Sequence, residues 1–189
     1  MRGSSSVLVF CEAKGPGEPE PISLEALGLG HELAGAMGLK LNAVSRCEIA
    51  SEIARHGPHC VYYAKAPLRD AYLPEWYVAF LKEACRRSDP LVIIFAHTPL
   101  GQDISPRLAE RLNTWLITDA VEVRFDGEKL LIKKPVQGGI ALATYFFKTT
   151  PQIVTVRKGV GKVKERNDSH PSEIVELEVP ADALEPGWE

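Results

Sequence analysis

The residues best placed to do chemistry follow an apolar run, Leu91–Ala96, that is typical of a buried parallel strand. Thr98, Gly101, Gln102 and Asp103 come directly after it, and an amphipathic helical pattern follows them. A glycine-containing turn between a strand and a helix lies at the carboxyl edge of a doubly wound sheet, where ligands bind. We therefore predict that these four residues bind a cofactor.

Two interpretations of this turn stay open. The free N–H groups and the dipole of a helix N-terminus attract the phosphate or ribose of a nucleotide. Alternatively, Asp103 or Ser105 caps the helix and Gly101 permits a tight turn. Asp103 would repel a phosphate and can pair with Arg107 four residues further on. Neither a Gly-x-Gly-x-x-Gly motif nor a Walker motif accompanies the turn.

Other reactive side chains stand apart from one another. His97 ends the predicted strand and is a candidate general base, as a hydrolytic enzyme would need, but no nucleophile motif lies beside it. Glu12 and Asp119 are either an acid pair or loop-end carboxylates that accept backbone N–H groups. The histidines show no metal-ligand spacing. We predict no catalytic residue and no metal site.

The cysteines Cys11, Cys47, Cys60 and Cys85 contain no Cys-x-x-Cys pair, so we expect structural roles for them. The side chains therefore offer no redox centre of their own. Electron transfer by this chain would require a bound cofactor to carry the chemistry.

Size and charge narrow the classes of function. The chain has 189 residues, is 45% hydrophobic and has a net charge of −3. This length allows one well-buried domain, and the charge gives no reason to expect nucleic-acid binding. No apolar run reaches membrane-spanning length and no signal peptide is recognisable, so we expect no membrane insertion and a cytoplasmic location.

The first half of the chain alternates between strand and helix patterns. We predict strands at Val7–Cys11, Leu39–Val44, Cys60–Ala64 and Leu91–Ala96. The predicted helices run from an N-cap at Ser23 to a stop at Gly38, from Glu48 to His56, and from Pro74 to Asp89. This alternation predicts an α/β fold, a three-layer sandwich around a mostly parallel, Rossmann-like sheet. Regular structure is not expected in the Gly/Pro-rich stretch Gly15–Pro21.

The second half predicts an antiparallel extension of that sheet. Ala120–Phe125 and Lys129–Lys134 flank an Asp126-Gly127 hairpin turn, and Ile140–Phe146 resumes the strand after Gly138-Gly139. The two glycines either bend a strand or let a partner backbone approach. Pro151–Arg157 is predicted to be a last central strand. We place one domain at residues 1–158, followed by a linker and a short strand at 159–189.

Four blocks of the sequence resemble the first domain of the electron transfer flavoprotein α subunit, in the order in which that family has them. They lie at 7–12 with 22–28, at 98–103 with 106–109, at 118–119, and at 135–139 with 141–144 and 151–157. The chain departs from the family pattern at Gln102, Gln137, Ile140 and Lys158, where the family usually has Arg, Tyr or Phe, Lys and Pro.

The resemblance implies a fold shared with adenine nucleotide α-hydrolase-like proteins and a role as a platform. It also implies a heterodimer with a β-type subunit, and FAD held by a separate domain before which this chain stops. Gln137, Gly138 and Gly139 are then candidate partner-interface residues. The chain would be an electron-carrier component rather than a catalyst. The alternative is a stand-alone module that binds AMP or ATP.

Overall fold

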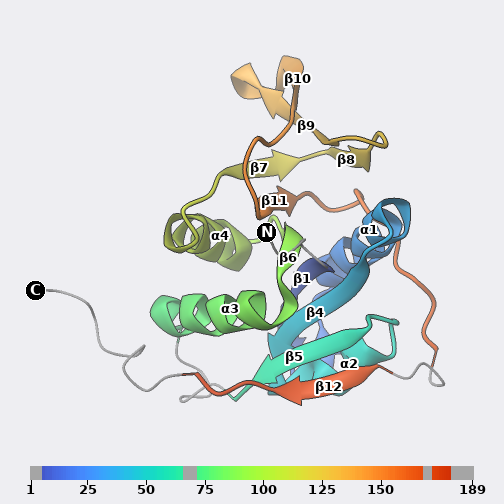
Figure 1. The fold of residues 1–189 in the computed structure, drawn as a ribbon, viewed down its shortest axis with the longest axis vertical. Coiled ribbons are helices and arrows are strands. Elements are labelled where there is room, and N and C mark those ends of the chain that lie inside the picture. Colours follow the sequence, from blue (N-terminus) through green and yellow to red (C-terminus); the bar gives the residue numbers. More distant parts are fainter. Residues whose placement is uncertain (1–5, 66–71, 168–171, 180–189) are drawn as a thin grey trace, which may run out of the picture.

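A parallel β-sheet forms the centre of the computed structural model, which describes residues 6–65, 72–167 and 172–179 (Figure 1). Within these residues, seven strands lie in the order β12-β5-β4-β1-β6-β11-β7, and every neighbouring pair is parallel. Their bounds are β1 Ser6–Cys11, β4 Lys40–Arg46, β5 Cys60–Ala64, β6 Pro90–Ala96, β7 Leu116–Ala120, β11 Gln152–Val156 and β12 Glu173–Glu176. The four strands predicted in the first half are confirmed.

Helices cover both faces of the sheet. On one face, α1 (Pro21–Met37) and α2 (Ala50–Ala54), with the 3₁₀ turn η1 (Cys47–Ile49), pack against Val7 and Val9 of β1. On the other, α3 (Pro74–Ser88) and α4 (Pro99–Arg111) pack against the alternate residues Leu8 and Phe10. Because both faces are covered, the central strands are mostly apolar, and the predicted three-layer α/β sandwich is confirmed.

A second, smaller sheet carries the antiparallel part. It consists of β8 (Glu122–Phe125), β9 (Leu130–Val136) and β10 (Ala141–Tyr145), in the order β10-β9-β8. We call residues 122–145 the arm. Its near end is buried against the α1 face through Val123, Leu130 and Ile132, whereas β10 lies at the far end of the molecule (Figure 1).

The antiparallel extension predicted in the second half is confirmed as the arm, which forms a sheet of its own, and the last central strand predicted at Pro151–Arg157 is confirmed as β11. The parallel strand β7 was not predicted. β7 and β11 belong to the parallel sheet, where β11 lies between β6 and β7. β7 was missed because its sequence, Leu-Ile-Thr-Asp-Ala, changes from apolar to polar within five residues and shows no clear periodicity. The Gly/Pro-rich stretch also differs from expectation: β2 (Ala13–Gly15) and β3 (Glu18–Pro19) pair across a turn that contains Gly17, whose φ is 75°.

Residues 158–167, which we call the strap, cross the outside of α1 instead of leaving the domain. A Cβ atom on Gly28 would collide with the carbonyl of Lys162, and one on Gly161 would collide with the carbonyl of Glu25. Strap and helix therefore touch backbone to backbone. Beyond them β12 pairs with β5 as an edge of the main sheet. The boundary after residue 158 stays a prediction, although β12 lies in the same sheet as β1.

Candidate functional site

The carboxyl edge of the sheet has a topological switch point between β1 and β6. The chain leaves β1 through α1 toward β4 on one side, while β6 lies on the other side of β1. Ligands of doubly wound folds bind in the crevice at such a point. Here Glu12, which follows β1, and Thr98, which follows β6, meet across it: the Thr98 hydroxyl donates to Glu12 Oε1 at 2.6 Å.

Thr98 is the N-cap of α4. Its Oγ1 accepts the N–H of Gly101 at 3.0 Å, and Pro99 occupies the first helical turn, where its missing N–H costs nothing. The expectation that Asp103 or Ser105 caps the helix was wrong, because the helix begins about one turn earlier than predicted. The threonine hydroxyl thus satisfies one of the N–H groups that a phosphate would have used.

Gly101 lies inside the first turn of α4 rather than in a loop before it. It is buried, and a Cβ atom there would collide with the carbonyl oxygen of Ala96 at the end of β6. Glycine is therefore required by the close approach of strand and helix, not by the tight turn that the sequence suggested.

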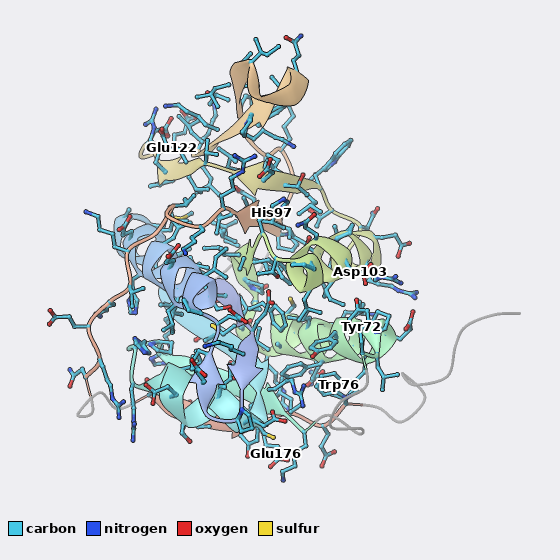
Figure 2. All side chains as sticks on the ribbon, turned by 180° about the vertical axis from the view of Figure 1, so that it is seen from behind. Tyr72, Trp76, His97, Asp103, Glu122 and Glu176 are labelled. Carbon is cyan, nitrogen blue, oxygen red and sulfur yellow. The ribbon has the colours of Figure 1, made fainter. Side chains whose placement is uncertain are left out.

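Gln102 and Asp103 point away from this contact. Gln102 is exposed. Asp103 pairs with Arg107 at 3.2 Å, as predicted, and accepts a hydrogen bond from the hydroxyl of Tyr72, which faces it between the starts of α3 and α4 (Figure 2). The Tyr72 hydroxyl and the Arg107 guanidinium lower the pKa of Asp103. Cofactor binding by Thr98, Gly101, Gln102 and Asp103 stays a prediction.

Glu12 is the most unusual group at this edge. Only 7% of the residue is exposed, and burial raises its pKa to about 7, although the bond from Thr98 opposes the shift; Glu20 raises the pKa further. The Glu12 backbone N–H donates to Ser23 Oγ, and its carbonyl accepts from the N–H of Glu20. The prediction that Ser23 is the N-cap of α1 was therefore wrong. The helix begins at Pro21, and Glu20 is its N-cap.

A second polar group lies at the carboxyl ends of β6, β11 and β7. His97 Nδ1 lies 2.7 Å from Thr155 Oγ1, which also accepts the N–H of Asp119, and the Asp119 carboxylate is bound by both Nε and Nη2 of Arg157. Partial burial lowers the pKa of His97, whereas the carboxylate of Asp119 raises it. Thr155 is fully buried, so it positions His97 and offers no accessible nucleophile.

Each member of the suggested acid pair has its own partner: Glu12 binds Thr98, and Asp119 binds Arg157. Thr155 and Arg157 were not singled out from the sequence. The only available signal was their position at the end of the predicted strand Pro151–Arg157. Among the described residues, no group of three or more His, Cys, Asp or Glu is placed to hold a metal ion.

Gln137, Gly138 and Gly139 form the exposed tip of the arm. They make a 3₁₀ turn, η2, with φ values of 51°, 67° and 92°, and this turn reverses the chain between the paired strands β9 and β10. The interpretation of the two glycines as a bend within one strand is therefore wrong: they build a hairpin connection between two strands.

Apolar side chains surround this tip. Ile140 is 88% exposed and Leu142 63% exposed, and Tyr145 and Phe146 are also exposed. β10 pairs only with β9, which leaves its other edge without a neighbour among the described strands. We call Ile140, Leu142, Tyr145 and Phe146 the apolar tip. The sequence signal for it was a seven-residue run, Ile140–Phe146, without a charge.

The fold and this edge define a doubly wound α/β domain whose switch point is closed by its own side chains. A sequence model of the family described as "Electron transfer flavoprotein domain" matches residues 7–182. The chain belongs to this family, and the resemblance found in the sequence is confirmed.

Two α subunits and a related protein illustrate the likeness. The chain is 29% identical to the electron transfer flavoprotein subunit alpha of Thermoanaerobacterium thermosaccharolyticum, an alignment that covers 94% of this chain and 56% of the relative. It is 32% identical to Protein FixB of Clostridium saccharobutylicum, covering 92% and 53%. For the Bacillus subtilis subunit alpha the identity is 29%, covering 92% and 54%. The chain thus spans about half the length of these curated relatives.

In the parts of the chain that the structure describes, no helix is both long enough and apolar enough to cross a membrane.

Proposed function

We propose that this chain is the platform of an electron transfer flavoprotein, an electron-carrier component rather than a catalyst. It docks a β-type subunit and supports the polypeptide that holds FAD. The observation that carries the proposal is the uncovered apolar tip on a chain whose family match spans residues 7–182. A cytoplasmic location stays a prediction from the sequence.

The arm supports docking of the β-type subunit. Exposed edge strands are usually short, charged or covered, because they pair readily with other chains. β10 has no charged side chain, and its neighbours Ile140 and Phe146 are exposed and apolar. Exposed large apolar side chains gathered on one short segment are typical of a subunit interface. We propose that Gln137, Gly138 and Gly139 lie in this interface as well.

The described residues of the predicted cofactor site do not fit FAD. The hydroxyl of Thr98 is engaged by Gly101 and Glu12, Asp103 is engaged by Arg107 and Tyr72, and the carboxyl group of Glu12 at this edge is buried. A pyrophosphate would have to displace these bonds and approach Glu12. We therefore propose that FAD, which supplies the redox chemistry when bound, is held by additional polypeptide.

The same bonds weigh against the alternative of a stand-alone AMP or ATP module, and the relatives do not favour it. Nothing in the charge of the chain supports a nucleic-acid partner. The proposed function therefore requires a protein partner and a flavin that is bound by additional polypeptide.

The test is to mix the purified chain with a recombinant electron transfer flavoprotein β-type subunit and measure the affinity and the mass of the complex. We expect a one-to-one complex, and we expect Leu142→Glu to weaken it at least about tenfold, because a charge on β10 must be desolvated at the interface. Ile174→Glu on β12 is the matched control, since Ile174 is also an exposed apolar strand residue.

If wild type and Leu142→Glu bind the β-type subunit equally well, the arm is not part of the interface. An absorption spectrum of the chain alone gives the second readout: flavin bands near about 370 and 450 nm would show that the chain holds flavin by itself, against the proposal.

A further inference from the structure

We propose that Glu12 and Thr98 form a proton-controlled lock on the first turn of α4, at the switch point of the sheet. In the closed state of this lock, ionised Glu12 accepts the Thr98 hydroxyl, which in turn caps α4. When Glu12 binds a proton, these hydrogen bonds weaken. This device is independent of the platform role proposed above, because it involves no residue of the arm.

Three groups make a continuous hydrogen-bonded chain in this lock. The N–H of Gly101 donates to Thr98 Oγ1 at 3.0 Å, and the Thr98 hydroxyl donates to Glu12 Oε1 at 2.6 Å. A hydroxyl that donates to a carboxylate is polarised, so its oxygen accepts other hydrogen bonds more strongly. Protonation of Glu12 removes the negative charge and weakens the acceptor for the Thr98 hydrogen. The cap on α4 therefore weakens with it.

The surroundings of Glu12 favour protonation at accessible pH. The titratable groups that face it are Cys11 on β1, Glu20 before α1 and Tyr77 on α3, with Thr98 at the start of α4. Within the described residues none of these groups is a cation: Arg46 faces Tyr77 and pairs with Glu48. The carboxyl is thus buried, is near the carboxylate of Glu20 and has Thr98 as its side-chain partner.

The backbone of Glu12 makes further connections that do not depend on the charge of its side chain. Its N–H and carbonyl bind Ser23 and Glu20 at the start of α1, on the opposite face of the sheet. One residue therefore joins the N-termini of two helices from two layers. Only the bond to Thr98 depends on the charge of the side chain, so the proton acts on α4 and leaves the connection to α1 in place.

The experiment is an NMR titration of the purified chain from about pH 5 to pH 9, which follows the Glu12 carboxyl carbon and the Gly101 amide. We expect both signals to titrate with one shared midpoint near 7. The exchange rate of the Gly101 amide, corrected for its intrinsic pH dependence, should rise about fivefold as Glu12 takes up its proton.

Three variants make the test specific. In Glu12→Gln the Gly101 signal should no longer titrate near 7, and in Thr98→Val it should be uncoupled from Glu12, whereas Thr98→Ser keeps the hydroxyl and the coupling. Glu20→Gln removes the neighbouring carboxylate and should leave the coupling intact. A Gly101 amide that is flat across the range, a Glu12 midpoint below about 5, or the same Gly101 titration in Glu12→Gln would each overturn the proposal.

Discussion

Glu12 shows how one residue can connect the starts of two helices through three of its polar groups. Its carboxyl reaches α4, its N–H reaches Ser23 and its carbonyl reaches Glu20. The backbone connections survive any substitution that keeps the local conformation. The carboxyl alone introduces a dependence on pH.

This dependence gives a prediction for stability. Folding raises the pKa of Glu12 from 4.5 to about 7, so the folded chain binds this proton more tightly than the unfolded chain does. The contribution of Glu12 to stability is therefore full below about pH 4.5 and is lost as the pH rises through 7. Between these limits the wild type should lose up to about 3 kcal/mol relative to Glu12→Gln.

Urea unfolding at several pH values between about 4.5 and 8 measures the difference. Glu20→Gln is the control, because it removes a carboxylate that is not buried like Glu12. Parallel stability curves for wild type and Glu12→Gln would show that Glu12 titrates normally in the folded chain.

Gly101 provides the second prediction at this scale. Gly101→Ala places a Cβ against the carbonyl of Ala96, where backbone must move, and should lower the free energy of unfolding by about 3 kcal/mol. Gly15→Ala is the matched control, because a Cβ there has nothing within 4 Å, and it should change stability by less than about 0.5 kcal/mol. Chemical denaturation compares the three proteins. An unchanged midpoint for Gly101→Ala would show that β6 and α4 can separate freely.

At the scale of elements, the strap and α1 approach each other closely because each has a glycine at the contact. Gly28 lies on the helix and Gly161 on the strap, and each faces a backbone carbonyl of the other segment. The N–H of Gly159 also donates to the carboxylate of Glu25 on α1. The strap is thus held by backbone geometry as well as by side chains.

Gly28→Ala should therefore push the strap away from α1 while the helix itself persists. We expect faster amide exchange and faster proteolysis in residues 158–167, with a loss of about 2 kcal/mol in stability. Gly35→Ala on the same helix meets nothing within 4 Å and should gain about 0.5 kcal/mol from its helix propensity. Equal protease sensitivity of the strap in both variants would contradict the packing described here.

The elements that could be predicted from the sequence are those with long apolar runs and clear ends. β6, with its buried Val92–Ala96, and α3, which begins at Pro74 and ends at Asp89, are examples. β7 and β3 could not be predicted, because Thr118 and Asp119 interrupt the first and Pro19 belongs to the second. Their strand structure depends on partners far away in the sequence.

At the candidate site, position could be predicted but roles could not. The edge that carries Thr98 and Gly101 followed from the order of strand and helix. That Thr98 is the cap and that Gly101 faces Ala96 depend on where α4 begins, which the sequence pattern placed about one turn too late. That Glu12 is buried and binds Thr98 depends on β1 lying beside β6, a contact between residues more than 80 positions apart. Local patterns carry no information about such contacts.

At the scale of the whole molecule, the main sheet includes a strand, β12, that lies beyond the predicted domain boundary at residue 158. Leu177 is buried in the core on the α3 face, and β12 pairs with Cys60–Tyr63 of β5. A chain that ends at residue 158 should therefore be less stable than the chain of 189 residues by about 3 kcal/mol or more. Without β12 and Leu177, the core residues that Leu177 contacts and the edge of β5 become exposed to solvent. A chain that ends at residue 179 keeps the strap and β12 and is the control.

Thermal and urea unfolding of the three chains would measure this loss. If the chain that ends at 158 unfolds with the same free energy as the chain that ends at 179, the predicted domain boundary is a real one and the later residues are an appendage.

The place of β11 between β6 and β7 has a consequence for the order of folding. Among the strands that the structure describes, β7 has no neighbour in the parallel sheet except β11, which follows it by more than 30 residues and comes after the entire arm. The arm is built from hairpins between nearby residues, so it can form early, whereas β7 has to wait until β11 inserts. During synthesis on the ribosome, residues 116–120 would therefore stay unpaired until residue 156 has emerged.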